Sequence, residues 1–178
     1  MKNIGKIFEQ QIQKSVPEYA LLYRVSDSAQ AFGGNSSLRF SSKNPFDFIL
    51  WDSMRHVLYA LELKTVAGKS ISFERTEEDR GEIHRHQIEG LGIWNEYDGT
   101  VCGFLIEFRA LETTIFLEIS EFNKLISEIQ KKSFNYTDLS KHSIKYFIVP
   151  QKKLRTKYLY DVGKLLQQEK LSLEENKE

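Results

Sequence analysis

The segment from Asn44 to Thr65 constrains the fold most, because two apolar strands there carry charged side chains. Its sequence is NPFDFILWDSMRHVLYALELKT. Residues 45–51 and 57–65 predict two strands joined by a short polar turn. The charged residues on these strands are Asp47, Glu62 and Lys64. The second strand is otherwise apolar on both faces, which predicts that both sides of it are covered. Ions buried in such a strand cost several kcal/mol unless partners compensate for them.

A hairpin register would bring these charges together. If Trp51 pairs with Leu58 across an antiparallel turn, Asp47 lies opposite Glu62 on one face of the sheet. Lys64 shares that face, one pleat further along. Two carboxylates directly across a ladder repel each other and invite a divalent cation, and carboxylate oxygens suit Mg²⁺ or Mn²⁺. The alternative is an ion cluster of the same three side chains at the surface.

Strand and helix patterns alternate along the rest of the chain and predict an α/β protein. Helices are expected over residues 3–15, 83–97, 120–132 and 158–171, and further strands over 19–25, 100–108, 113–119 and 144–149. The stretch 26–44 is rich in Ser and Gly and is long for a plain loop, which favours a functional projection. We expect one domain over residues 1–178, with a frayed tail over 173–178.

The overall charge is balanced, with 25 basic and 25 acidic residues, but its distribution is uneven. Between Lys131 and Lys157 there are eight Lys or Arg residues and one acid, Asp138. Such a basic segment can hold a phosphate backbone, and the alternative is an ordinary solvated surface.

Other features of the sequence narrow the class of protein. The single cysteine, Cys102, lies in an apolar strand and is expected to be a small core residue in a reducing compartment. The N-terminal segment MKNIGKIFEQ becomes polar by its second turn, so no signal peptide is expected. No apolar run approaches the roughly 20 residues of a membrane span, so no membrane partner is expected.

The spacing of Asp47 and Glu62-Leu63-Lys64 resembles the core of the PD-(D/E)XK nucleases. Further motifs occur in the order seen in RecU-type Holliday junction resolvases, above all their phage-encoded relatives. These motifs are Gly5-x-x-Phe8-Glu9, Arg24 with Asp27, and His86-Gln87-Ile88 with Leu91. The resemblance covers most of residues 3–135. It implies a restriction-endonuclease-like fold, in which helices flank a mixed central sheet and residues 26–44 form a protruding loop or stalk.

The resemblance also implies a metal site and its chemistry. The implied ligands are Asp47, Glu62, the Leu63 carbonyl and Glu9, which binds directly or through water. The metal would be Mg²⁺, with Mn²⁺ as a substitute. Lys64 would orient the attacking water or neutralise developing charge. Gln87 would lie over the site and contact DNA or a metal-bound water.

Contacts to DNA are expected outside this centre as well. By resemblance, Arg24 lies near the scissile phosphate or an adjacent one. Arg39 and Lys43 belong to the expected stalk, and Lys69 and Ser70 follow the catalytic strand. The remaining expected contacts come from the basic segment: Lys131, Lys132, Lys152, Lys153 and Arg155.

The function expected from this resemblance is a Mg²⁺-dependent endonuclease that resolves four-way DNA junctions by paired symmetric nicks during recombination. A homodimer would supply two symmetric sites. Branched DNA and other recombination proteins are the expected partners, in the cytoplasm of a bacterial host cell and from a phage or prophage gene. The alternatives are a PD-(D/E)XK nuclease of flap or restriction-like specificity, a catalytically silent DNA-binding recombination protein, and a protein-interaction domain without DNA affinity.

Overall fold

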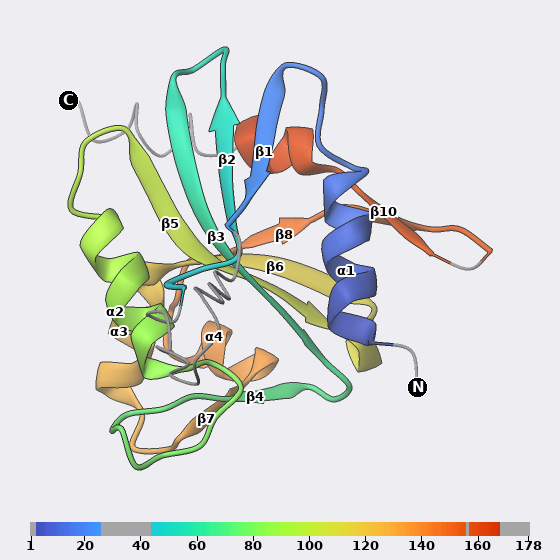
Figure 1. Cartoon of the computed structure of the whole chain (residues 1–178). Helices are drawn as coiled ribbons and strands as arrows, with labels where there is room; N and C mark the ends of the chain where they lie inside the picture. Colours follow the sequence, from blue (N-terminus) through green and yellow to red (C-terminus); the bar gives the residue numbers. More distant parts are fainter. Residues whose placement is uncertain (1–2, 26–43, 156, 168–178) are drawn as a thin grey trace, which may run out of the picture.

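The computed structural model describes residues 3–25, 44–155 and 157–167. In this part of the chain six strands form one mixed sheet in the order β1–β2–β3–β5–β6–β8 (Figure 1). The strands are β1 Ala20–Arg24, β2 Phe48–Asp52, β3 Val57–Val66, β5 Thr100–Phe108, β6 Thr113–Glu118 and β8 Phe147–Val149. β3 and β5 are parallel, and the other neighbours are antiparallel. The predicted mixed central sheet of an α/β protein is confirmed.

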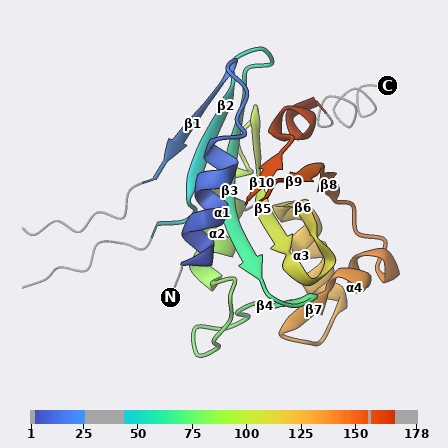
Figure 2. The same cartoon turned by 90° about the vertical axis from the view of Figure 1, so that its right-hand side faces the viewer.

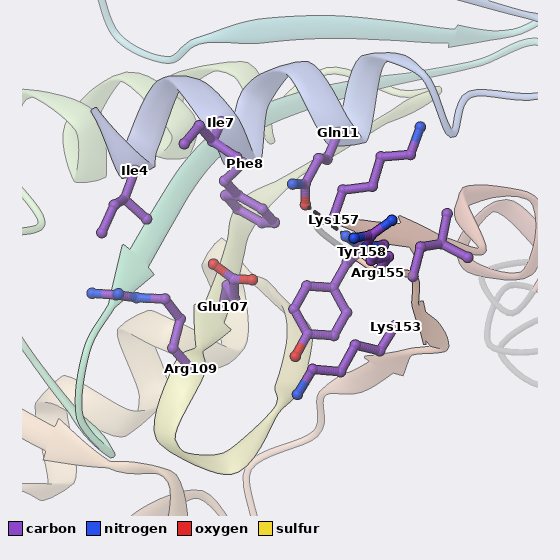
Figure 3. A pocket seen from close by; sticks show the side chains of 11 residues that line it. Ile4, Ile7, Phe8, Gln11, Glu107, Arg109, Lys153, Arg155, Lys157 and Tyr158 are labelled. Atoms are coloured by element: carbon purple, nitrogen blue, oxygen red, sulfur yellow. Dashed lines mark hydrogen bonds between the residues drawn. The ribbon is translucent and has the colours of Figure 1, made fainter. Parts of the chain in front are cut away.

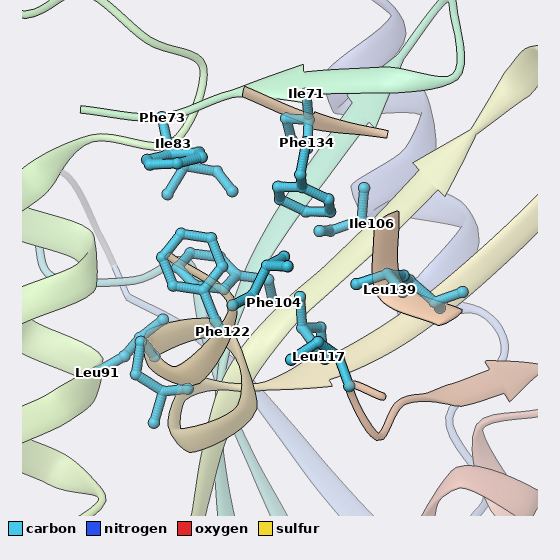
Figure 4. Close-up of a cluster of buried hydrophobic side chains, with 14 of the residues drawn as sticks. Ile71, Phe73, Ile83, Leu91, Phe104, Ile106, Leu117, Phe122, Phe134 and Leu139 are labelled. Carbon is cyan, nitrogen blue, oxygen red and sulfur yellow. The ribbon is translucent and has the colours of Figure 1, made fainter. Parts of the chain in front are cut away.

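Helices cover both faces of this sheet (Figures 1 and 2). α1 (Ile4–Gln13) and the helical residues 162–167 pack on one face, where Phe8 and Leu165 join the same apolar cluster. α2 (Arg85–Trp94), α3 (Ile119–Glu128) and α4 (Tyr136–Lys141) pack on the other. Figure 4 shows this second cluster around Phe104 and Phe122. We call the two sides the α1 face and the α2 face.

The central strand β3 contributes to both cores because its side chains alternate between the faces. Leu61 and Leu63 belong to the cluster on the α1 face, whereas Ala60 and Val66 belong to the one on the α2 face. This double burial accounts for the nearly continuous apolar sequence of the strand.

The predicted register of the β2–β3 hairpin is confirmed. Trp51 pairs with Leu58 and Phe48 with Leu61, which is the expected alignment. The turn is closed by His56, which has a positive φ of 58°. Asp47 lies one residue before β2, and its backbone N–H donates to the Leu61 carbonyl at 3.1 Å. The alignment therefore continues to Asp47.

Two small sheets and two short elements were not predicted. β4 (Ser70–Ser72) pairs with β7 (Ser133–Asn135), and β9 (Gln151–Lys153) pairs with β10 (Tyr158–Tyr160). The short elements are α4 and the 3₁₀ turn η1 (Arg109–Leu111). These strands have only three residues each, too few for a period-2 pattern to stand out.

Several predicted boundaries were wrong. The last helix begins at residue 162 rather than 158, because residues 158–160 form β10, where Tyr160 packs edge-on against Phe8. The helix predicted over 83–97 begins at Arg85, since Ile83 forms a β-bridge with Phe73. The helix predicted over 120–132 ends at Glu128, and the strand predicted over 144–149 contains only Phe147–Val149.

Two expectations concern segments outside the described residues. The predicted stalk lies almost wholly in residues 26–43, and the predicted frayed tail lies in 173–178. In the part of the chain that is described, no helix is long and apolar enough to cross a membrane.

Candidate active site

Asp47, Glu62 and Lys64 come together on the α2 face, beside the start of β2. The backbone N–H of Leu63 donates to Asp47 Oδ2 at 2.9 Å, which holds this carboxylate against β3. Lys64 Nζ lies 3.0 Å from Glu62 Oε1. Glu62 is only 3% exposed, so its ion pair with Lys64 lies in a largely desolvated position. The predicted shared face of Glu62 and Lys64 is confirmed.

Gln87 connects α2 to this cluster. Its Nε2 donates to Glu62 Oε1 at 2.5 Å, and its Oε1 accepts the backbone N–H of His84 at 2.9 Å. The second bond is half of a capping box at the start of the helix. Both polar ends of this buried amide are therefore satisfied, and Gln87 is fixed beside Glu62. Its predicted contact with DNA or a metal-bound water stays a prediction.

The approach of α2 depends on a glycine. A Cβ added to Gly90 would overlap the side chain of Pro45 and would lie 3.1 Å from its Cα. Pro45 is two residues before Asp47. Gly90 thus allows the helix that carries Gln87 to contact the segment that carries Asp47. Gly92, on the same helix, has open space where its Cβ would be.

Glu9 and Arg24 reach the cluster from α1 and from the end of β1. Arg24 Nε lies 3.2 Å from Glu9 Oε2, and both side chains are partly exposed. The Glu9 carboxylate is close enough to act electrostatically on Asp47 and Glu62. The structure therefore brings together six predicted side chains and the backbone of Leu63. The six are Glu9, Arg24, Asp47, Glu62, Lys64 and Gln87.

Charge repulsion and burial shift the acids of this cluster. Burial raises the pKa of Glu62 from 4.5 to about 7, and Asp47 and Glu9 act in the same direction while Lys64 opposes them. Burial also raises the pKa of Asp47, against the lowering effect of the Leu63 N–H. Three acids, Glu9, Asp47 and Glu62, face two cations, Lys64 and Arg24, so an additional cation would be stabilised.

The donor set fits a hard divalent cation. Asp47 and Glu62 offer two carboxylates, and Mg²⁺ typically takes one or two protein carboxylates and keeps several waters. Among the described residues, no group of three or more Asp, Glu, His or Cys side chains is arranged to hold a metal by itself. The role predicted for the Leu63 carbonyl and for Glu9 as ligands stays a prediction.

The other predicted DNA contacts lie in two separate groups. Lys69, Ser70, Lys131 and Lys132 gather at the β4–β7 pair, where Ser70 Oγ donates to the Phe134 carbonyl and Lys132 Nζ lies 2.5 Å from Asp79 Oδ1. Lys152, Lys153 and Arg155 belong to the β9–β10 hairpin and its turn, and all three are exposed. Arg39 and Lys43 lie outside the described residues.

Sequence reasoning missed another buried carboxylate, Glu107 on β5. Thr65 Oγ1 donates to Glu107 Oε2 at 2.6 Å, and the Tyr160 hydroxyl donates to Oε1 at 2.9 Å. The available signal was an acid inside the apolar strand TVCGFLIEF, the same kind of signal that marked Glu62. Gly90 was missed as well, because a close helix approach leaves no local pattern.

Comparisons with known proteins add family information. No curated protein matches the chain. Among solved structures, the chain is similar to Hjc of Archaeoglobus fulgidus, described as a Holliday junction resolvase from an archaeal hyperthermophile. The likeness has a TM-score of 0.47 and 10% sequence identity, and it covers 75% of this chain and 88% of Hjc.

A family model provides the stronger result. The model of recombination protein U, RecU, matches residues 63–164. This range covers more than half of the chain and includes Lys64, Gln87 and Glu107, but it begins one residue after Glu62. The chain therefore belongs to the RecU family.

Proposed function

We propose that this protein is a Mg²⁺-dependent endonuclease that resolves four-way DNA junctions by paired symmetric nicks. The observation that carries the proposal is the convergence of Asp47, Glu62 and Lys64 on one face of the sheet in a member of the RecU family. Raised carboxylate pKa values and a nearby cation are typical of sites that bind metal and perform hydrolysis.

Each residue of the site has a role in this proposal. Asp47 and Glu62 would hold the Mg²⁺, with Glu9 and the Leu63 carbonyl as further ligands. When bound, such a metal supplies a more acidic water and charge relief at the phosphate. Lys64 stabilises negative charge that develops on the phosphate or orients the attacking water. Gln87 fixes the Glu62 carboxylate through its hydrogen bond, and Arg24 holds Glu9.

Symmetric cleavage also requires two sites. A dimer with two-fold symmetry places two identical centres at the two strands to be cut. We propose such a homodimer, with branched DNA and other recombination proteins as partners, in the cytoplasm of a bacterial cell. The single domain over residues 1–178 and the stalk over residues 26–44 belong to the same proposal.

The test is cleavage of labelled four-way junction, duplex and flap DNA by the purified protein. Each substrate is incubated with Mg²⁺, with Mn²⁺ and with EDTA. Asp47→Asn and Lys64→Ala are tested beside Lys124→Ala, which removes an exposed lysine that donates to the Ser143 carbonyl. We expect paired nicks in the junction that EDTA, Asp47→Asn and Lys64→Ala abolish and that Lys124→Ala preserves.

The other outcomes select among the alternatives. Preferred cleavage of duplex or flap DNA would support the nuclease active site but reject four-way junctions as the preferred substrate. Metal-independent binding of junction DNA without cleavage would reject the enzyme and leave a DNA-binding recombination protein. Absence of both binding and cleavage would reject both the nuclease and the DNA-binding recombination protein.

A further inference from the structure

A concave site lies on the α1 face, between α1 and the β9–β10 hairpin (Figure 3). Its cavity volume is about 320 Å³. Ile4, Ile7 and Phe8 of α1 provide an apolar wall, and the ring of Tyr158 faces them from β10. We call this site the hairpin cleft. Its size falls at the lower end of the range for small-ligand sites.

Four cationic side chains line the hairpin cleft. Arg109 comes from η1, and Lys153, Arg155 and Lys157 come from the hairpin. In Figure 3, Arg109 lies on one side of Glu107 and Lys153 on the other. Lys153 pairs with Glu112. Within the described residues, the side chains of Arg109, Arg155 and Lys157 make no ion pair, and all three are exposed.

Among the described residues that line the cleft, Glu107 is the one acid, but it is held at the floor. It is 6% exposed, and its two oxygens accept hydrogen bonds from Thr65 and Tyr160. Glu107 therefore forms no ion pair with Arg109 or Arg155 at the rim, and their charges are not neutralised by direct contact with it. An anion would be attracted to the cationic rim and repelled from the floor.

The hairpin cleft and the candidate active site lie on opposite faces of the sheet. Thr65 is the parallel partner of Glu107, and it follows Lys64 on β3. Because side chains alternate along a strand, Thr65 and Glu107 point to the α1 face while Glu62 and Lys64 point to the α2 face. The two core clusters show the same division, with Leu63 in one and Val66 in the other.

We infer that the hairpin cleft binds the sugar-phosphate backbone of a DNA segment remote from the phosphate that is cut. The inference rests on the proposed function and extends it. One guanidinium group can donate two parallel hydrogen bonds to the oxygens of one phosphate, so Arg109 and Arg155 provide the main contacts. Ile4, Ile7 and Tyr158 provide an apolar surface against the sugar. A junction offers such a second segment, whereas a short duplex centred on the cut does not.

The test measures binding to junction DNA over a series of salt concentrations. Lys64→Ala serves as the background, so that the DNA stays uncut in Mg²⁺. Arg109→Ala and Arg155→Ala are combined in this background, and Lys14→Ala, which removes an exposed cation at the other end of α1, is the matched control. The same proteins are titrated with a duplex of about one helical turn.

We expect the double variant to bind the junction about 10-fold more weakly and to lose about 2 units from the slope of log affinity against log salt, since each phosphate contact contributes about 0.9. The control and the short duplex should show neither change. Equal affinity and slope for the double variant and the control would overturn the inference. An equal loss on the short duplex would overturn the remote location. If the wild-type protein cuts no branched DNA, the proposed function fails instead.

Discussion

Glu62 and Glu107 are buried on the neighbouring strands β3 and β5, and they have different surroundings. Glu107, on the α1 face, accepts hydrogen bonds from the hydroxyl groups of Thr65 and Tyr160. Glu62, on the α2 face, contacts Lys64 and Gln87 and lies near two further acids. Both carboxylates are buried, with Glu62 3% exposed and Glu107 6% exposed, so burial does not distinguish them.

The difference lies in the neighbouring charges. Asp47 and Glu9 repel Glu62 and add to the effect of burial, which raises its pKa to about 7. The protein therefore keeps several acids together at a cost in stability, which a bound cation would relieve. A buried acid by itself indicates little about function, whereas buried acids that repel one another indicate a site for a cation.

Substitutions of Glu62 and of Glu107 should show most clearly which of the two carboxylates is needed for cleavage. We expect Glu62→Gln to reduce junction cleavage at least about 10³-fold, because it removes a metal ligand while preserving the shape of the side chain. Glu107→Gln should reduce cleavage by less than about 10-fold. Single-turnover cleavage at saturating protein measures both rates. Similar losses for the two variants would remove the functional distinction between the two faces.

The pH dependence of stability provides a second test. Because the pKa of Glu62 is raised from 4.5 to about 7, the folded protein binds more protons than the unfolded chain between these pH values. Without metal, the free energy of unfolding should therefore fall as pH rises through this window, by about 3 kcal/mol at most. The raised pKa of Asp47 acts in the same direction.

Urea unfolding in EDTA at pH 5, 6, 7 and 8 measures this dependence. Glu62→Gln should flatten the curve and be more stable than the wild-type protein at pH 8. Since metal binding needs ionised carboxylates, Mg²⁺ affinity of the wild-type protein should rise from pH 6 to pH 8. A flat wild-type curve would contradict the assignment of the raised pKa to Glu62.

The sequence predicted the central hairpin and its charges well. The constant register from Trp51–Leu58 to Asp47 followed from strand pairing, and the apolar sequence of β3 indicated burial on both faces. Gln87 was predicted beside the site by resemblance, and its bond to Glu62 agrees with that position. Local pairing rules were sufficient here because the hairpin joins residues that are close in the chain.

Contacts between distant segments could not be predicted in this way. β10 looked like the first turn of a helix, because Leu159, Val162, Leu165 and Leu166 fit a helical period. Its pairing with β9 and the contact of Tyr160 with Phe8 decided the outcome. The hairpin cleft depends on the same distant packing, so its lining could not be derived from the basic sequence alone.

Disturbing the close approach of α2 to Pro45 should lower cleavage by less than substituting the acids does, but by a measurable amount. Gly90→Ala would force Pro45 and the adjoining Asp47 to move, so we expect cleavage to fall about 10- to 100-fold and stability to fall by about 1–3 kcal/mol. Gly92→Ala on the same helix meets open space and should stabilise the protein by about 0.5–1 kcal/mol without loss of cleavage. Thermal unfolding and cleavage rates distinguish the two. Equal effects would show that α2 does not position Asp47.

The smallest expected effects come from removing one hydrogen-bond donor at each buried carboxylate. Gln87→Ala removes the donor to Glu62, and Tyr160→Phe removes a donor to Glu107. A hydrogen bond to a charged group contributes about 1.5–3 kcal/mol, so each variant should lose stability of this order. Only Gln87→Ala should also lower cleavage, by about 10-fold, because it leaves Lys64 alone to hold the Glu62 carboxylate. The cleavage rate with saturating Mg²⁺ is compared for variants of matched stability. If Tyr160→Phe lowers cleavage as much as Gln87→Ala, both carboxylates act through the stability of the sheet, and the geometry around Glu62 has no separate role.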